Sequence, residues 1–308
     1  MAIEALGFVI VQTGKLDDWD VFLGDVVGAM RVDSTDGAAR HYRIDDRPFR
    51  FRLVEGAEER FLAAAYRLDS LASLDALAER LAAAGHDVVF GDAEAAAARF
   101  VDSYFSVHDP AGNGLEFYCG DRTADEPFVS PVGVERFVTG GLGMGHAVFA
   151  APDYEASYAF YHDLIGFHDT DLANFKFLPD PSVPGVRFAF LHADNARHHS
   201  LAIGELPPTP VGCNHLMLEV PTRADVDACN ERMNKAGVPE SSTMGMHTND
   251  KMVSFYMQCP SGFDVEIGSD GLVLDPATWT PTAFDTPSEW GHEWAWQKAL
   301  AEQLGQGD

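Results

Sequence analysis

Apolar side chains recur at helical spacing in three segments of the chain, residues 71–81, 154–165 and 226–236. In the second segment they are Tyr154, Tyr158, Tyr161 and Ile165, at i, i+4, i+7 and i+11, which places them on one helical face. A glycine follows the third segment at Gly237, where it favours helix termination. We therefore predict a helix with one buried face in each segment.

Apolar and polar residues alternate in the segments that follow these helices, as expected for strands with one buried face. Residues 215–220, 253–257 and 263–267 have this pattern, and residues 109–112 and 259–262 provide turn signals. The order of a strand, a helix and then several strands predicts βαβββ modules. In such a module a curved sheet buries its convex face under helices and leaves its concave face free.

The chain contains an internal repeat, which organises these elements. Residues 7–28 match residues 145–166 at a shift of 138, Glu79-Arg80 match Glu231-Arg232 at 152, and Glu116 matches Glu266 at 150. The three matches occur in the same order and need only short insertions between them. We predict an α+β protein with two homologous domains of paired βαβββ modules, residues 1–135 and 136–290, and a C-terminal tail, 291–308.

Strand alternation places several polar side chains on one concave face of the second half. In 215–220 the apolar set faces the helices and His215 points to the other side, as does Glu266 in 263–267 and Tyr256 in 253–257. His146 opens a further strand. A five-residue loop from Cys259 to Phe263 would place Tyr256 directly opposite Glu266 in a hairpin.

Two histidines and one carboxylate with open positions form the facial triad of non-haem Fe(II) oxygenases. A single histidine on a strand is more often structural, but His146, His215 and Glu266 share one face. In the first half the repeat places Phe8 and about Ala63 at the two histidine positions, and only Glu116 is kept. We therefore predict one metal site, in the second half, and the sequence does not separate Fe(II) from Mn(II).

Composition limits the possible partners. The chain has 308 residues and a formal net charge of −27, which disfavours nucleic acid and an anionic membrane surface. No apolar run approaches the roughly 18–20 residues of a membrane span. The N-terminal residues lack the pattern of a signal peptide, and the four cysteines have no zinc-like spacing. These features favour a cytoplasmic protein.

Residues 245–256, together with Pro260, Gly262 and Glu266, resemble the type I extradiol catechol dioxygenases of the vicinal oxygen chelate superfamily. The likeness extends over nearly the whole chain through blocks at 143–146, 197–202, 215–217 and 290–292, and is greatest to two-domain enzymes similar to 2,3-dihydroxybiphenyl dioxygenase. It implies the glyoxalase-like fold. Cys259 and Met246 depart from the residues common in the family, although neither change removes a functional group.

The resemblance implies roles for seven residues. His146, His215 and Glu266 match the iron ligands, whereas His199, His247 and Tyr256 match catalytic residues around the metal. His199 would be the acid–base group, and His247 and Tyr256 would contact the substrate oxygens. Asp250 matches an acidic residue that would orient His247. Of the adjacent His198 and His199, we expect only His199 to face the cavity.

The implied function is extradiol cleavage of a catechol by O2 in a homo-oligomer. Five residues could line a wide apolar pocket for a bicyclic or polycyclic catechol, although they could equally be core: Phe175, Phe177, Phe188, Phe190 and Met217. Trp290, Trp294 and Trp296 could form a subunit contact or cap the site. Two alternatives stay open, another metalloenzyme of the superfamily, such as a glyoxalase-like isomerase or an epoxide-opening thiol transferase, and a non-catalytic ligand-binding module.

Overall fold

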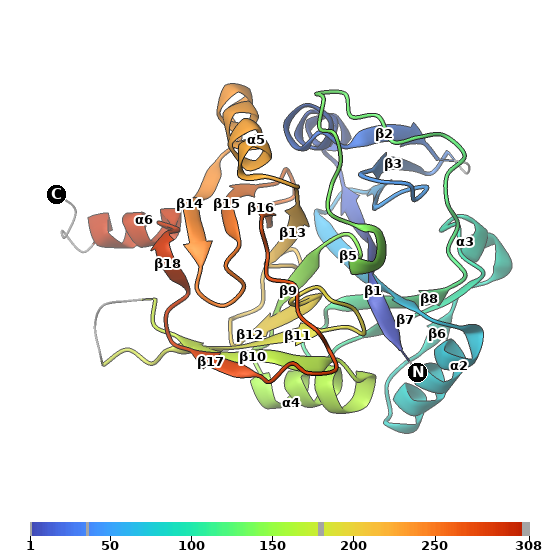
Figure 1. The fold of residues 1–308 in the computed structure, drawn as a ribbon. Coiled ribbons are helices and arrows are strands. Elements are labelled where there is room, and N and C mark those ends of the chain that lie inside the picture. The colour runs from blue at the N-terminus through green and yellow to red at the C-terminus, as the bar shows by residue number, and fades with distance from the viewer. Residues whose placement is uncertain (1, 35–36, 178–181, 304–308) are drawn as a thin grey trace.

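The chain forms two curved sheets with helices on their outer faces (Figure 1), in a computed structural model that describes residues 2–34, 37–177 and 182–303. The first sheet contains β1 (Ile3–Thr13), β2 (Met30–Asp33), β3 (Ala39–Arg43), β4 (Phe51–Glu55), β5 (Arg60–Leu68), β6 (Val89–Phe90), β7 (Ser103–His108) and β8 (Gly114–Cys119). Its spatial order is β2-β3-β4-β1-β5-β8-β7-β6.

The second sheet repeats this arrangement and adds one strand at each edge. It contains β9 (His146–Ala150), β10 (His168–Phe175), β11 (Val186–His192), β12 (Leu201–Gly204), β13 (His215–Glu219), β14 (Glu240–His247), β15 (Val253–Gln258), β16 (Asp264–Ser269), β17 (Thr282–Phe284) and β18 (Ser288–Gly291). The order is β17-β10-β11-β12-β9-β13-β16-β15-β14-β18. The predicted α+β fold of paired βαβββ modules is therefore confirmed, whereas β17 and β18 were not predicted.

The longer helical segments of the first half have counterparts in the second, at the shifts of the sequence repeat. The helices are α1 (Leu16–Trp19) with η1 (Asp20–Val27), α2 (Leu71–Ala83), α3 (Ala93–Ala97), η2 (Gly140–Leu142), α4 (Tyr154–Tyr158) with η3 (Ala159–Ile165), α5 (Arg223–Ala236) and α6 (Ala295–Gln303). The helix predicted over 154–165 becomes a π-helix at Ala159, as does its counterpart at Asp20. An apolar stripe does not separate α from π geometry, because the segment still buries one continuous face, which includes Tyr154, Tyr161 and Ile165.

Helix ends follow the predicted chemistry. Gly237 ends α5 with φ +70°, and Thr222 and Asp225 form a capping box at its start. Gly28 and Gly166 end the two π-helices with φ +93° and +97°. Side chains with a Cβ rarely adopt this left-handed region, which explains the glycine at both equivalent positions.

One apolar core continues from the first sheet into the second. Trp19 of the first half packs against Phe263 of the second at 5.9 Å between ring centroids, and its Nε1 donates to Ser261 Oγ at 3.1 Å. At the other end of the molecule, Arg80 of α2 donates to the Ile165 carbonyl of η3 at 2.7 Å. The two halves thus contact each other at both ends, through buried aromatic rings at one end and an arginine hydrogen bond at the other.

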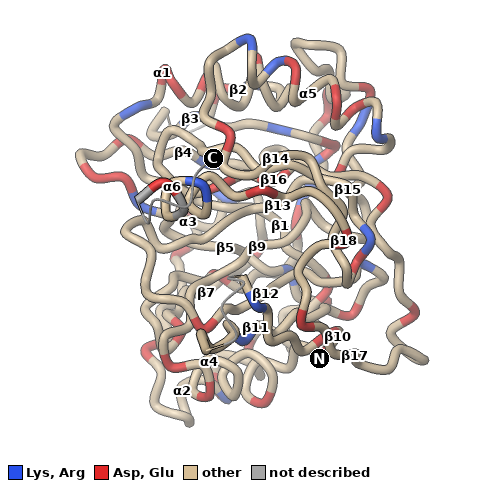
Figure 2. The backbone as a smooth tube through the Cα atoms, turned by 90° about the vertical axis from the view of Figure 1, so that its left-hand side faces the viewer, with Lys and Arg blue, Asp and Glu red and all other residues tan. Residues whose placement is uncertain are grey.

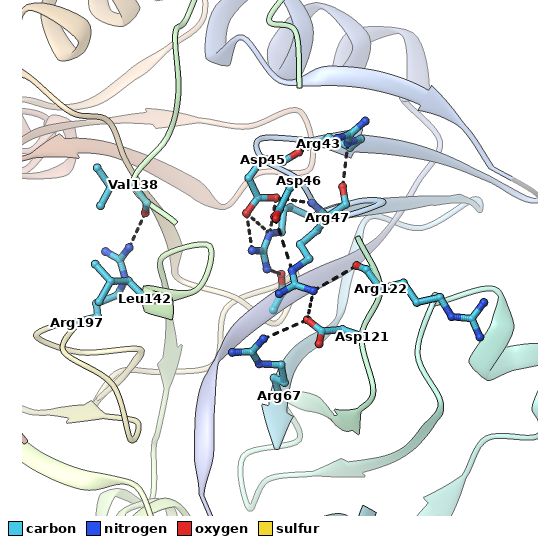
Figure 3. Close-up of polar contacts among 12 residues, drawn as sticks. Arg43, Asp45, Asp46, Arg47, Arg67, Asp121, Arg122, Val138, Leu142 and Arg197 are labelled. Atoms are coloured by element: carbon cyan, nitrogen blue, oxygen red, sulfur yellow. Dashed lines mark hydrogen bonds and ion pairs between the residues drawn. The ribbon is translucent and has the colours of Figure 1, made fainter. Parts of the chain in front are cut away.

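Buried arginines fix the segment that connects the two sheets, as Arg197 does beside Val138 and Leu142 (Figure 3). Arg43 donates to Glu126 O at 2.9 Å, and Arg197 donates to Val138 O and Leu142 O at 2.8 and 2.9 Å. These charge-assisted bonds satisfy carbonyls that lie outside regular structure. The connection therefore adopts a defined path although it has little secondary structure.

Charged residues are scattered over both sheets and the helices, with Lys and Arg interspersed among Asp and Glu (Figure 2). No helix in the described ranges has the length and apolar composition needed to cross a membrane.

Candidate active site

Strand register brings three polar side chains to one face of the second sheet. On β13, Met217 pairs with His146 of β9 on one side and with Glu266 of β16 on the other. His215 lies two residues before Met217, so it points to the same face. The structure therefore unites the three predicted metal ligands, although they are 51 to 120 residues apart in the sequence.

The three donor atoms surround one point. His146 Nε2 lies 3.3 Å from His215 Nε2, and Glu266 Oε2 lies 3.5 and 3.6 Å from these two nitrogens. Atoms that each bind one ion at about 2.0–2.2 Å are separated by roughly 3–3.5 Å, so the set fits a metal. Asn214 Oδ1 lies 3.0 Å from His215 Nδ1, which fixes the proton there and leaves Nε2 free as a ligand.

The protonation states also suit a metal. Burial lowers the pKa of His215 to about 3, so this side chain is neutral. Burial raises the pKa of Glu266, but hydrogen bonds from His146 and His247 outweigh it and hold that pKa well below its usual range. Metal ligands must be deprotonated, and both groups are so at neutral pH.

His247 and Tyr256 lie beside the carboxylate. Tyr256 of β15 pairs directly with Glu266, which confirms the predicted five-residue loop. His247 Nε2 lies 2.8 Å from Tyr256 Oη and 3.2 Å from Glu266 Oε1. Burial lowers the pKa of His247, but Glu266 and Asp250 raise it to about 9. Burial and Glu266 raise the pKa of Tyr256 well above 10, so the phenol stays protonated.

His199 closes the other side of the group. Its ring stacks on His146 at 4.0 Å between centroids and meets Phe190 edge-on at 5.0 Å. It is 3% exposed, and burial together with His146 and His198 lowers its pKa well below 6.5. His199 is thus a neutral imidazole beside the metal ligands.

An apolar cavity of about 380 Å³ opens onto these groups. Its lining includes His146, His199, His215, His247, Tyr256 and Glu266. The opposite walls are aromatic and aliphatic, with Phe175, Phe177, Phe188, Leu206, Trp294 and Trp296. A few convergent polar groups at one end of an apolar cavity are typical of a small-molecule site.

Comparison with known proteins identifies the family. The profile of the Glyoxalase/Bleomycin resistance protein/Dioxygenase superfamily matches residues 143–267, and that of Dihydroxybiphenyl dioxygenase BphC D1 matches residues 6–56. The biphenyl-2,3-diol 1,2-dioxygenase of Paraburkholderia xenovorans is 37% identical over 98% of this chain and 99% of its own length. The chain belongs to the extradiol dioxygenases.

Two further relatives agree with this assignment. The iron-dependent extradiol dioxygenase of Rhodococcus jostii is 35% identical and covers 96% of this chain and 98% of its own. The crystal structure of a halotolerant catechol dioxygenase superposes with a TM-score of 0.86 at 30% identity, covering 99% and 98% of the two chains. The likeness of this extradiol dioxygenase to its relatives therefore spans both sheets.

Three expectations about this extradiol dioxygenase need correction in detail. Asp250 makes no hydrogen bond to His247 in the described residues; its Oδ1 accepts from Met252 N at 3.0 Å, and Pro287 O lies 3.2 Å from His247 Nδ1. His198 and His199 lie in a loop before β12, not on a strand, although His199 does face the cavity. Met217 is absent from the lining of this cavity and instead lines a smaller one beside it, together with Arg197 and Met252.

Some residues of this extradiol dioxygenase site were missed as functional from the sequence. Asn214 orients His215 through its side-chain oxygen. The ring of His292 stacks on that of His247 at 4.2 Å between centroids, and Ser288 Oγ lies 2.7 Å from His292 Nδ1. The adjacency of Asn214 and His215 was the one local signal available. Trp294 and Trp296 line the cavity, as one of the two readings of the aromatic tail expected.

Proposed function

We propose that this protein opens the ring of a catechol beside its two hydroxyl-bearing carbons, incorporating both atoms of O2 into the product. The observation that carries the proposal is the convergence of His146 Nε2, His215 Nε2 and Glu266 Oε2 within 3.6 Å of one another at the polar end of the apolar cavity. These residues would hold Fe(II), with Mn(II) as the alternative metal. When bound, Fe(II) supplies redox chemistry with O2 and the Lewis acidity that lowers the pKa of a catechol hydroxyl.

The protein side chains would bind and orient the substrate, and they would accept and donate the protons that the reaction moves. Tyr256, kept protonated, donates a hydrogen bond from Oη to a substrate oxygen, and His247 donates from Nε2 to the deprotonated oxygen. His199, kept neutral, accepts a hydroxyl proton and returns it when the ring opens. The aromatic walls exclude water from this end of the cavity.

The aromatic walls favour a bicyclic catechol. Phe175, Phe188 and Trp294 present ring faces and edges to a cavity that is wider than one benzene ring needs. Relatives named for biphenyl-2,3-diol are 35–38% identical, compared with 33% for one named for 3-methylcatechol and 29% for those named for 1,2-dihydroxynaphthalene. We therefore propose 2,3-dihydroxybiphenyl as the type of substrate.

Oxygen uptake tests the function directly. The protein, loaded anaerobically with Fe(II), is mixed with catechol, 3-methylcatechol, 2,3-dihydroxybiphenyl or 1,2-dihydroxynaphthalene. We expect one O2 per substrate, a yellow ring-opened product and the highest kcat/KM for 2,3-dihydroxybiphenyl. No uptake with any of the four would contradict the proposal and favour an isomerase or a binding module.

Three further expectations remain predictions beside this proposal. They are the division into domains 1–135 and 136–290 with a tail at 291–308, the homo-oligomeric state and the cytoplasmic location. Limited proteolysis, light scattering and cell fractionation address them in turn.

A further inference from the structure

A line of three buried side chains leads from the cavity into the protein. His199 Nδ1 lies 3.0 Å from His198 Nδ1, and His198 Nε2 lies 3.0 Å from Asp171 Oδ2. The exposed fractions are 3% for each histidine and zero for Asp171. A carboxylate, an imidazole and the imidazole that borders the cavity therefore follow one another at hydrogen-bond distance.

Two segments distant in sequence hold this line in place. Thr282 of β17 pairs with Asp171 of β10, and its hydroxyl donates to Asp171 Oδ1. Thr170 Oγ1 donates to the His198 carbonyl at 2.6 Å, and the Trp279 ring meets the His198 ring edge-on at 5.7 Å. The carboxylate therefore has one oxygen fixed by Thr282, and only the other oxygen faces His198.

The polar contacts of His198 and His199 determine which ring nitrogens carry protons. Among the described residues, His198 Nε2 and Asp171 Oδ2 are buried and form no hydrogen bond of good geometry, so their 3.0 Å ion-pair contact is the one polar contact of each atom, and the carboxylate favours a proton on Nε2. A neutral His198 then has a bare Nδ1. The two Nδ1 atoms can share only one proton, so that proton belongs to His199. His199 Nε2 is consequently left bare for the cavity.

A second carboxylate lies nearby but does not compete for these atoms. Asp250 has an oxygen within 4.8 Å of a ring nitrogen of both histidines. Its Oδ1 accepts from Met252 N, and Asp250 forms no ion pair or hydrogen bond with either histidine in the residues that the structure describes, whereas Asp171 Oδ2 lies 3.0 Å from His198 Nε2. Asp171 is therefore the carboxylate that selects the tautomer.

We propose that Asp171 and His198 are positioning residues that fix His199 in the tautomer with a bare Nε2. The proposal rests on the function given above, in which His199 accepts the hydroxyl proton of the catechol. When Nε2 takes this proton, Nδ1 keeps its own and donates to His198, so the new charge faces a buried carboxylate through one imidazole. The proton then passes from Nε2 to the product, and His199 is again neutral, with its proton on Nδ1 and a bare Nε2.

Replacement of Asp171 by asparagine tests the proposal with little change in shape. Because Thr282 already donates to Oδ1, the amide of Asp171→Asn would present its NH2 group to His198 Nε2. The proton of His198 would move to Nδ1, that of His199 to Nε2, and the base would be blocked. We expect kcat for 2,3-dihydroxybiphenyl to fall by about 100-fold or more, the contribution of a general base, with KM and iron content little changed.

Histidine NMR gives a readout that does not depend on turnover. In ¹⁵N-histidine protein loaded with diamagnetic Zn(II), two-bond ¹H–¹⁵N correlations distinguish the tautomers, and His199→Gln assigns the His199 signals. We expect His199 protonated at Nδ1 in the unmodified protein and at Nε2 in Asp171→Asn. Asp169→Asn is the matched control, since Asp169 lies on the same strand but contacts Tyr158.

The outcomes separate the two proposals. A bare Nδ1 on His199 in the unmodified protein overturns the relay, even if Asp171→Asn does not fold. Unchanged kcat and tautomer in a folded Asp171→Asn protein also overturn it. Absence of O2 uptake by the unmodified iron-loaded protein instead contradicts the proposed function and leaves the tautomer result standing on its own.

Discussion

The position and the protonation state of the Tyr256 hydroxyl are set by burial, by His247 and by Glu266. The side chain is 3% exposed, its Oη lies 2.8 Å from His247 Nε2, and the residue pairs across the sheet with Glu266. Burial and the neighbouring carboxylate raise its pKa well above 10. At neutral pH the phenol therefore keeps its proton, so it can donate a hydrogen bond to a substrate oxygen but is not a base.

Removal of this hydroxyl should slow catalysis without loss of the metal. In Tyr256→Phe we expect kcat to fall on the order of 100-fold, because one positioned donor is lost, while iron content stays at that of the unmodified protein. Steady-state O2 uptake and metal analysis measure the two quantities. A variant with unchanged kcat would show that Tyr256 serves only packing.

At the scale of elements, the approach of β9 to β13 sets the geometry of the metal ligands. Gly145 immediately precedes His146 and has φ +150°, and a Cβ built there would lie 1.8 Å from the Met217 carbonyl oxygen. Any side chain at this position must therefore push β9 away from β13. His146 moves with its strand, whereas His215 stays on the other.

Gly145→Ala should accordingly lower both stability and metal affinity. We expect the free energy of unfolding to fall by about 2 kcal/mol or more, and Fe(II) affinity to fall at least tenfold. Gly237→Ala is the control, because its φ of +70° is also left-handed but no atom lies within 4 Å of the added Cβ. It should cost about 1 kcal/mol and leave iron binding unchanged. Equal iron affinities in the two variants would contradict the argument.

The pair of strands β10 and β11 contains a histidine that affects stability in acid. His192 is 4% exposed, and its Nδ1 lies 2.9 Å from Thr170 Oγ1. Burial and the neighbouring His168 lower its pKa from 6.5 to about 4. The unfolded chain thus binds a proton more readily than the folded one, so stability falls as the pH drops below about 6.5 and levels off below about 4.

Substitution of this residue should flatten the acid dependence. Between pH 7 and pH 5 we expect the unmodified protein to lose about 2 kcal/mol more stability than His192→Asn, from the size of the pKa shift. Urea unfolding at the two pH values gives the difference. Parallel losses in both proteins would show that His192 titrates normally.

On the scale of the whole molecule, the first sheet keeps the strand register of the metal site but has apolar side chains at the two positions that correspond to the histidine ligands. Phe8 pairs with Ala65, and Ala65 with Glu116, as His146 pairs with Met217 and Met217 with Glu266. The register thus confirms the predicted equivalence of Phe8 with His146 and of Ala63 with His215. Arg99 binds Glu116 through two bonds of 2.7 Å, so a guanidinium supplies the positive charge there.

The two equivalent glutamates should therefore respond differently to the same change. Glu116→Gln leaves a partly buried Arg99 without its carboxylate partner and should lower the free energy of unfolding by about 1–3 kcal/mol, with one iron still bound per chain. Glu266→Gln should lose most of the iron. Metal analysis and chemical denaturation of both variants test this contrast, and loss of iron in Glu116→Gln would argue for a second metal site.

The sequence predicted the repeat, the modules and the shared face of His146, His215 and Glu266. These follow from periodicity, because alternation along a strand decides which side chains face the helices. The edge strands β17 and β18 were missed, since they are short and do not belong to the repeated unit. Asp171 was also missed, because a buried aspartate on a strand has no local pattern.

The sequence by itself determined the class of fold, the donor set and the acidic charge of −27. Those properties depend on residue type and on whether each position faces core or solvent. Only the tertiary structure decided which groups touch: Asn214 with His215, Pro287 with His247, and Asp171 with His198. Such contacts depend on sheet curvature and register between segments far apart in the chain, and local periodicity does not encode either.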